Sequence, residues 1–408
     1  MQQQSNIRIE RKFGILLILI HTPFGLTFFD KIAKTKAARV YAEFNTYLMP
    51  LITALICFLI FIGIGTMLAS SEAREGVRGL GPQANLLIPG LNPLLPWTYT
   101  LIALFITIVI HEAGHGIVAR VYNLKIESTG IVLFLIVPVG AFVNIEREEL
   151  AKASLKQKCA ILTAGPLNNM LLAVFSVIAL YFVVSTLNPL ADPNQNYDVV
   201  VTQVRPDSLA EQLGLTQGSV IQSIDGQEVN GINDIGKLLG SSIGENIEVT
   251  WSEKNGDTVS RSGQNQNGKL GITIVGGGSP SEILDIYKRA FLDPRGYLLL
   301  LAPPTLAQNA LPAPYSDALA PEYESTLFGS YFPMISNMLF WLWFINFNVG
   351  LFNALPIGPL DGGQLYGSVI ENKLKNKERR LNAQTLIAAI TIIFTVLVFV
   401  MIAGPYIF

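Results

Sequence analysis

Five apolar runs in the chain are long enough to cross a lipid bilayer as helices, which takes about 20 residues each. They cover residues 48–69, 97–121, 159–184, 332–355 and 386–408. The bilayer interior offers no water to backbone amides and carbonyls, so each run is expected to satisfy them within a helix. Only 14% of all residues are charged, whereas soluble domains carry about 25%. The sequence therefore predicts a polytopic α-helical membrane protein with five or six transmembrane helices.

Two shorter apolar runs do not fit a spanning helix. Residues 13–29 contain His21, Pro23 and Gly25, which divide the run into two halves. Residues 130–143 are rich in β-branched side chains, which favour strands, and this run is too short to span as a helix. We predict that both enter the membrane as hairpins, where irregular backbone has to be buried in protein or line a cavity.

Basic residues set the expected orientation, since cytosolic loops are enriched in Lys and Arg. Clusters of them lie within residues 8–39, 120–158 and 373–380. With five spans and a cytosolic N-terminus, all three clusters fall on the cytosolic side, and the region of residues 188–331 lies outside the cytosol. The net charge of −2 gives no sign of a nucleic-acid partner. The sequence thus predicts a multi-pass protein of the cell membrane, surrounded by the lipid bilayer.

The second apolar run contains the sequence His-Glu-Ala-Gly-His at residues 111–115. On a helix, His111 and His115 lie one turn apart on the same face, so both side chains can reach one metal ion. Glu112 is offset by one position, where a carboxylate can act as general base on water. Ionisable side chains inside a membrane span are costly and are usually functional. The pattern predicts a hydrolytic site with one zinc ion per chain, toward the cytosolic end of its span.

A catalytic zinc ion usually has three protein ligands and one open position, so a third side chain is needed. His21, the remaining histidine, is one candidate. Asp361 is the one we favour, because it follows an apolar run and is framed by Pro356, Pro359 and a Gly-Gly pair. Prolines and glycines break the helix and let the backbone turn a carboxylate inward. The alternative for Asp361 is a helix-capping role at the membrane surface.

Residues 196–278 differ in character, with more glycines and polar residues and with alternating apolar patterns. Strands are predicted at 199–204, 218–226, 246–251 and 268–275, and helices at 208–213 and 233–239. This order, and the segment SLAEQLGLTQGSVIQSIDGQEV, resemble a PDZ domain of the bacterial protease-associated type. Such domains bind a peptide as an added strand. By resemblance, Leu270, Gly271 and Ile272 lie at the ligand edge. A PDZ fold that only blocks access sterically is the alternative.

Two motifs flank this inserted α+β domain, HEAGH before it and NALPIGPLDGG at residues 353–363 after it. In this order they closely resemble the site-2 proteases, a family of intramembrane zinc metalloproteases. The resemblance implies that Asp361 is the third zinc ligand. It also implies that the amide of Asn353 donates to the developing oxyanion or binds the substrate backbone.

Further stretches extend this resemblance. The sequence AGPLNN at residues 164–169 matches a family helix start, which implicates Asn169 in substrate or helix contacts; a helix-packing role is the alternative. Residues 87–93 and 138–143 are similar to the archaeal and eukaryotic branch of the family. In that family the second of these regions forms a membrane-embedded β-hairpin that can align substrate as an added strand.

The predicted organisation has five parts. They are a membrane-associated segment (1–45), the first half of the protease core (46–186), the PDZ domain (196–278), a linker or gate (279–330) and the second half of the core (331–408). The resemblance implies regulated intramembrane proteolysis, with transmembrane proteins as substrates and a substrate tail or other peptide at the PDZ domain. A transporter would predict inverted repeats, and the sequence shows none. A non-catalytic PDZ scaffold would lack the metal site.

Overall fold

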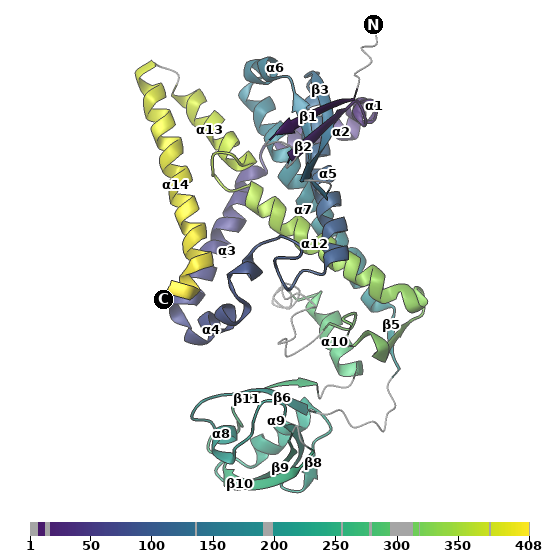
Figure 1. The fold of residues 1–408 in the computed structure, drawn as a ribbon, viewed down its shortest axis with the longest axis vertical. Helices are drawn as coiled ribbons and strands as arrows, with labels where there is room; N and C mark the ends of the chain where they lie inside the picture. The colour runs from purple at the N-terminus through teal and green to yellow at the C-terminus, as the bar shows by residue number, and fades with distance from the viewer. Residues whose placement is uncertain are drawn as a thin grey trace. The chain divides into compact units, whose positions relative to one another are not determined.

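The computed structural model of the chain describes residues 7–12, 17–134, 137–190, 199–253, 256–276, 280–293, 313–317, 319–374 and 377–407 (Figure 1). The chain divides into two compact units. One comprises Met1–Val177 with Met338–Phe408, and the other comprises Ile178–Asn337. Both division points fall inside long helices, α7 (Leu155–Ser185) and α12 (Phe332–Asn353).

Within the described residues, five helices are long and apolar enough to cross a membrane. They are α3 (Met49–Ala69), α5 (Trp97–Val121), α7, the helix Gly329–Asn353 that contains α12, and α14 (Lys377–Ile407). The five predicted runs are thereby confirmed, and the chain is a polytopic membrane protein. Apolar side chains of α14, such as Ile392, Val396 and Phe399, are exposed. A surface of this kind is unfavourable in water and favourable against lipid.

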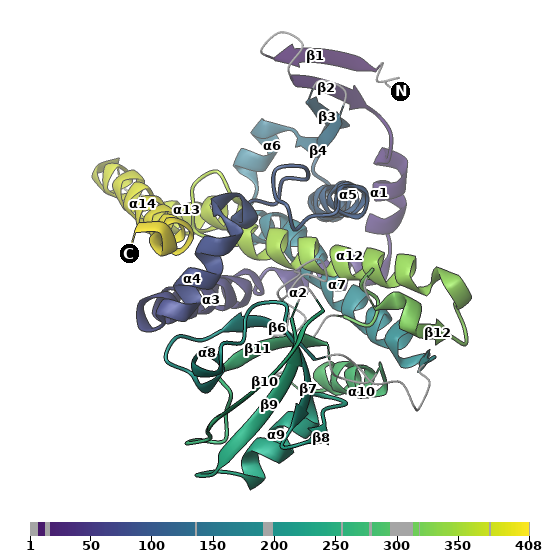
Figure 2. The same cartoon turned by 60° about the horizontal axis from the view of Figure 1, so that its bottom comes forward.

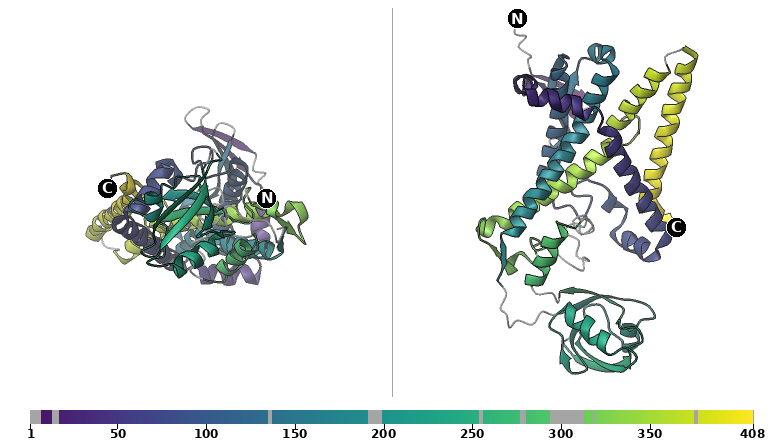
Figure 3. Two further views of the ribbon diagram at one scale, coloured as in Figure 1. Left: turned by 90° about the horizontal axis from the view of Figure 1, so that it is seen from below. Right: turned by 180° about the vertical axis from the view of Figure 1, so that it is seen from behind.

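Shorter helices complete the first unit: α1 (Leu26–Ala33), α2 (Lys36–Asn45), α4 (Ser71–Leu80), η1 (Pro82–Asn85), α6 (Arg147–Lys152) and α13 (Asp361–Lys373). Helices α2 and α4 each begin at a capping hydroxyl: Thr35 accepts from the Ala38 amide and Ser70 from the Ala73 amide, both at 3.1 Å. Helix α14 lies beside α3 and α13 (Figure 3). Apolar side chains of α3, α7, α12 and α13 pack into one cluster, which holds the two halves of this unit together.

An antiparallel sheet of four strands lies beside α5 (Figure 2). Its strands are β1 (Arg8–Lys12), β2 (Leu17–Thr22), β3 (Ile126–Phe134) and β4 (Val137–Ile145), paired in that order. The predicted 130–143 hairpin is therefore formed by β3 and β4, although β3 begins four residues earlier than expected. In the run 13–29, β2 leads into α1, and residues 13–16 lie outside the described residues. That either segment enters a membrane stays a prediction.

The second unit contains a mixed domain at residues 199–276. Its strands are β6 (Val199–Val204), β7 (Val220–Ile224), β8 (Gln227–Glu228), β9 (Asn246–Ser252), β10 (Thr258–Gln264) and β11 (Ile272–Gly276), and its helices are α8 (Leu209–Leu213) and α9 (Ile232–Ser241). The sheet order is β10-β9-β7-β6-β11, with β8 paired to β7. Trp251 lies fully buried in its apolar core.

Two features of this domain differ from the prediction. The strand expected at 268–275 begins only at Ile272, because Gly271 has a φ of +79°, outside the strand region. Strand β10 was not predicted at all. Its sequence TVSRSGQ has little apolar alternation, since it is an edge strand with mostly exposed side chains.

The segment predicted as a linker or gate has structure of its own. Helix α10 (Pro280–Ala290) is followed, after residues outside the described ranges, by η2 (Ala320–Glu322), β12 (Tyr323–Ser325) and η3 (Gly329–Tyr331). Strand β12 pairs with β5 (Leu187–Pro189). The buried phenols of Tyr287 and Tyr315 lie edge to face, with ring centroids 6.4 Å apart. A gating role for this segment stays a prediction.

Candidate active site

His111 and His115 project from the same face of α5, as the spacing predicts. Their ring centroids lie 4.9 Å apart in an edge-to-face arrangement, and His111 is buried. Between them in sequence, Gly114 lets α5 approach α7 closely. A Cβ atom at Gly114 would lie 2.6 Å from the Ala164 carbonyl oxygen, closer than real Cβ contacts. The small residue inside the motif therefore keeps α7 against the two imidazoles.

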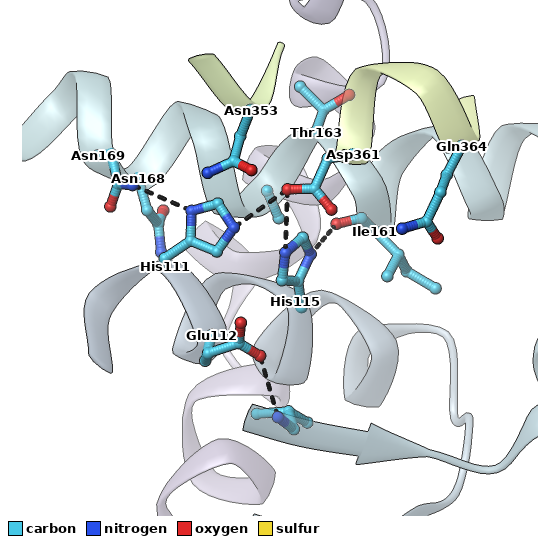
Figure 4. Close-up of polar contacts among 12 residues, drawn as sticks. His111, Glu112, His115, Ile161, Thr163, Asn168, Asn169, Asn353, Asp361 and Gln364 are labelled. Atoms are coloured by element: carbon cyan, nitrogen blue, oxygen red, sulfur yellow. Dashed lines mark hydrogen bonds and ion pairs between the residues drawn. The ribbon is translucent and has the colours of Figure 1, made fainter. Parts of the chain in front are cut away.

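Asp361 joins these histidines from a distant part of the chain (Figure 4). Its Oδ2 atom lies 3.0 Å from His111 Nε2 and 3.5 Å from His115 Nε2. Two imidazole nitrogens and one carboxylate oxygen therefore converge on a common point.

A tight turn directs the Asp361 carboxylate inward from the first residue of α13. A Cβ atom at Gly362 would lie 2.3 Å from the Ala354 carbonyl oxygen, and one at Gly363 would lie 2.0 Å from that of Ile357. Any larger residue at either position would push the start of α13 away from the segment 354–357 that follows α12. The Gly-Gly pair thus explains how a carboxylate that follows a membrane span reaches α5.

The Nδ1 atoms of both imidazoles face α7. His115 Nδ1 lies 2.7 Å from the Ile161 carbonyl oxygen, to which it donates. His111 Nδ1 lies 3.0 Å from the side-chain nitrogen of Asn169, whose side chain is fully buried. The Nε2 atoms of both rings are thereby left on the side of Asp361. Asn169 thus contacts a histidine of the motif, whereas the sequence predicted substrate or helix contacts for it.

Glu112 points away from Asp361, toward the sheet. Its Oε2 atom accepts a hydrogen bond of 3.0 Å from the backbone amide of Val143 in β4 (Figure 4). Strand β4 packs against α5 and is the last strand in its sheet. Potential ligand atoms of His111, Glu112 and His115 all lie within 4.8 Å of one another. The carboxylate is therefore held between the two histidines and an edge strand.

Asn353 lies beside this cluster at the end of α12 (Figure 4). Its amide nitrogen donates to the Val349 carbonyl oxygen of its own helix at 3.1 Å. The other candidate ligand, His21, lies in β2, where Nδ1 is 3.0 Å from Ser128 Oγ and Nε2 is 3.5 Å from a carboxylate oxygen of Glu10. The geometry thus brings Asp361, and not His21, to the two histidines of α5.

Leu270, Gly271 and Ile272 lie in the other unit, at the start of β11. Leu270 is buried, and its carbonyl oxygen accepts from the Ala210 amide at 2.9 Å. Strand β11 ends its sheet, so among the described residues its outer edge is unpaired. An added peptide strand therefore has an edge available from Ile272 onward.

Three residues of the site were given no role of their own from the sequence: Ile161, Gly165 of the AGPLNN segment, and Val143 of the predicted hairpin. Two of them act through backbone atoms and the third through the side chain that it lacks, so none carries a chemical signature. The helical spacing offered a signal, because residues 161, 165 and 169 recur every four positions and must share one face of a helix.

Comparison with known proteins agrees with this arrangement. Residues 99–315 and 326–398 match the family model of peptidase family M50. The chain belongs to peptidase family M50. Like other M50 members of the site-2 protease type, it is a zinc metalloendopeptidase, and the scaffold and transporter alternatives are set aside.

Relatives of this M50 peptidase include proteins from archaea and bacteria. An uncharacterised protein of Methanocaldococcus jannaschii is 24% identical over 90% of this chain and 82% of its own length, in keeping with the archaeal-type branch. A Campylobacter jejuni protein, named provisionally as a zinc metalloprotease, is 25% identical over 68% of this chain and 84% of its own. The protease RseP of Yersinia pestis is 27% identical over 36% of each chain.

The residues of this M50 peptidase fit a zinc ion. Two imidazole nitrogens and one carboxylate oxygen form a donor set that is common in catalytic zinc sites. Space for the ion is provided by Gly165. A Cβ atom at this position would lie 2.5 Å from His115 Nε2 and 2.6 Å from His111 Nε2. A hollow that any larger side chain would fill therefore lies against both donor atoms.

Proposed function

We propose that the protein is an intramembrane endopeptidase that cleaves membrane-protein substrates within or near their transmembrane segments. The observation that carries this proposal is that Asp361 of α13 meets His111 and His115 of α5, a helix apolar enough to cross a membrane. Family membership supplies the reaction, which is zinc-dependent peptide hydrolysis. The depth of the motif in a candidate span supports a scissile bond that lies at the membrane.

In this proposal His111, His115 and Asp361 hold the zinc ion. Zinc in such a site supplies Lewis acidity toward water and toward the scissile carbonyl group. The hydrogen bond from His115 Nδ1 to the Ile161 carbonyl oxygen leaves the lone pair of His115 on Nε2, where it can serve as a ligand. The carboxylate of Asp361 adds the negative charge that a divalent cation favours.

Glu112 is the proposed carrier of the proton that leaves the attacking water. It accepts a proton from the attacking water and passes it to the nitrogen of the leaving amine, as a general base and then a general acid. The Val143 amide keeps one carboxylate oxygen in place and leaves the other free for this transfer. Asn353 is the proposed donor to the carbonyl oxygen of the substrate as negative charge develops there. Its amide nitrogen carries two hydrogens, and the bond to the Val349 carbonyl oxygen uses one of them.

The edge of β4 is the proposed place for the substrate. The Val143 amide donates to Glu112 and so points away from β3. An extended peptide pairing with this edge would therefore run past Glu112, with its own amide bonds exposed. A transmembrane helix hides its peptide bonds inside the helix, so local unwinding has to come first.

The protein is proposed to have one orientation in the membrane and to select substrates through residues 196–278. The distribution of Lys and Arg favours a zinc site toward the cytosol and residues 196–278 outside it. That region is proposed to be a PDZ domain that binds a substrate tail or another peptide along the unpaired edge of β11, through Leu270, Gly271 and Ile272. This arrangement suits an enzyme of regulated intramembrane proteolysis.

Substrate unwinding gives a direct test. Two model transmembrane substrates of equal length would differ only at the cleavage region, one with Leu-Leu and one with Asn-Gly. Glycine in a helix costs about 1 kcal/mol relative to alanine, so we expect the Asn-Gly substrate to be cleaved roughly 5- to 10-fold faster. Purified protein in lipid bilayers and a gel assay of both products measure the rates. Equal rates for the two substrates, or cleavage confined to a soluble loop, would contradict the proposal.

A further inference from the structure

Helix α7 contributes no ligand to the cluster, yet one of its faces contacts both histidines. Ile161, Gly165 and Asn169 follow one another at intervals of four residues, so they line up along the helix. Ile161 contacts His115, Asn169 contacts His111, and Gly165 lies between them against both Nε2 atoms. Three consecutive turns of one helix therefore face the two imidazoles.

The contact at His111 is informative because either end of the Asn169 amide could make it. The side-chain nitrogen of Asn169 lies 3.0 Å from His111 Nδ1, while its Oδ1 is buried without a hydrogen-bond partner among the described residues. The two ends of an amide have nearly the same shape, and the hydrogen-bond network decides between them. With the amide turned over, Oδ1 accepts from the Nδ1–H of His111, and the amide nitrogen takes the position without a partner.

Zinc binding by His111 requires the orientation in which the Asn169 amide is turned over. A neutral imidazole carries one N–H, and the nitrogen without a proton is the ligand. If His111 Nδ1 accepted from Asn169, its Nε2 would hold the proton and could not bind zinc. If Nδ1 donates to Asn169 Oδ1, Nε2 is free on the side of Asp361, as it is in His115.

Gly165 is the residue of this face that lies against the Nε2 atoms of both histidines. A Cβ atom there would lie 2.5 and 2.6 Å from the two Nε2 atoms, which is closer than van der Waals contact. The space beside the donor atoms exists because this one position has no side chain. By comparison, a Cβ atom at Gly65 in α3 would have nothing within 4 Å.

From these contacts we propose that Ile161, Gly165 and Asn169 form a positioning face on α7 that sets the zinc site, with the amide oxygen of Asn169 fixing the tautomer and direction of His111. Asn169 is thus a positioning residue, separate from its neighbour Asn168. Asn168 instead accepts from the Tyr41 hydroxyl at 2.6 Å and donates to the Ile110 carbonyl oxygen at 3.1 Å, which ties helices together. This inference rests on the proposal that His111 and His115 bind zinc.

The first test compares Asn169→Leu with Asn169→Asp. Leucine has a similar size and accepts no hydrogen bond, so we expect zinc affinity to fall about 10- to 100-fold, the usual effect of losing an outer partner of a histidine ligand. Aspartate still accepts from Nδ1–H, so its zinc affinity should stay within a few-fold of the wild type. Competition with a chromogenic chelator measures both affinities. The absorption spectrum of the cobalt-substituted protein reports the ligand geometry, which a purely structural role would leave unchanged.

The control is Tyr41→Phe, which removes the hydroxyl partner of Asn168 and should lower the unfolding temperature without changing zinc affinity. If Asn169→Leu does not fold without metal, Asn169→Ala removes the acceptor without adding bulk. Leucine and aspartate variants with equal zinc affinity would overturn the inference. The proposed function is tested separately by His111→Ala, because it fails if zinc binding survives that change.

The second test is Gly165→Ala, with Gly65→Ala as the matched control in another candidate span. The added methyl group at position 165 has to occupy the hollow beside both Nε2 atoms, so we expect zinc affinity to fall more than about 100-fold, beyond the effect of an outer partner. The control should bind zinc as the wild type does. Wild-type zinc affinity in folded Gly165→Ala protein would show that the ion lies elsewhere.

Discussion

Replacing Glu112 with glutamine should lower the rate of peptide hydrolysis by about 10²- to 10⁴-fold, the range attributed to a general base. Glutamine is the informative substitution because its amide oxygen can still accept from the Val143 amide, which holds the native carboxylate at 3.0 Å. The side chain then keeps its position and loses only its ability to take a proton. Cleavage of a model transmembrane substrate, together with the zinc content of the same preparation, measures the effect.

The matched control for this change is Glu148→Gln in α6. The Glu148 side chain is 83% exposed and lies near Lys152, so loss of its charge should leave both cleavage and zinc content unchanged. If Glu112→Gln retained zinc and cleaved substrate at the wild-type rate, the base would have to be another group. Loss of zinc from Glu112→Gln would instead indicate that Glu112 is a ligand.

The membrane-spanning helices could be predicted because length and apolar composition are local properties of the sequence. The sheet beside α5 could not be predicted in the same way. Pairing of β2 with β3 joins Ile20 to Ile131, more than a hundred residues away, and no local pattern specifies that partner. The strand β3 also extends beyond its apolar run, since Glu127 and Ser128 interrupt the pattern at its start.

The candidate site was predicted where chemistry lies in side chains. His111, Glu112 and His115 follow from helical spacing, and Asp361 was favoured because the Pro and Gly residues around it break the helix. What the sequence did not reveal is the role of α7. A backbone carbonyl, a missing Cβ atom and an amide that contacts a histidine ring are recognised only once the helices are placed next to one another.

Replacing Asp361 with alanine should abolish cleavage and weaken zinc binding by more than about 100-fold, which is more than the loss of an outer partner costs. The change removes the carboxylate whose Oδ2 atom lies 3.0 and 3.5 Å from the two Nε2 atoms. It leaves two neutral imidazoles, which are a poor site for a divalent cation. Equilibrium dialysis with zinc-buffered solutions measures the affinity directly, independently of any substrate.

Two comparisons make this result specific to Asp361. Gln364 lies one turn further along α13, where its amide donates to the Pro359 carbonyl oxygen, so Gln364→Ala should keep zinc. His21→Ala should also keep zinc, because its imidazole is engaged by Ser128 and Glu10 in the sheet. Retention of zinc by Asp361→Ala together with its loss from His21→Ala would transfer the third ligand to β2. That outcome would require β2 to move toward α5, since the resting structure holds His21 against β3.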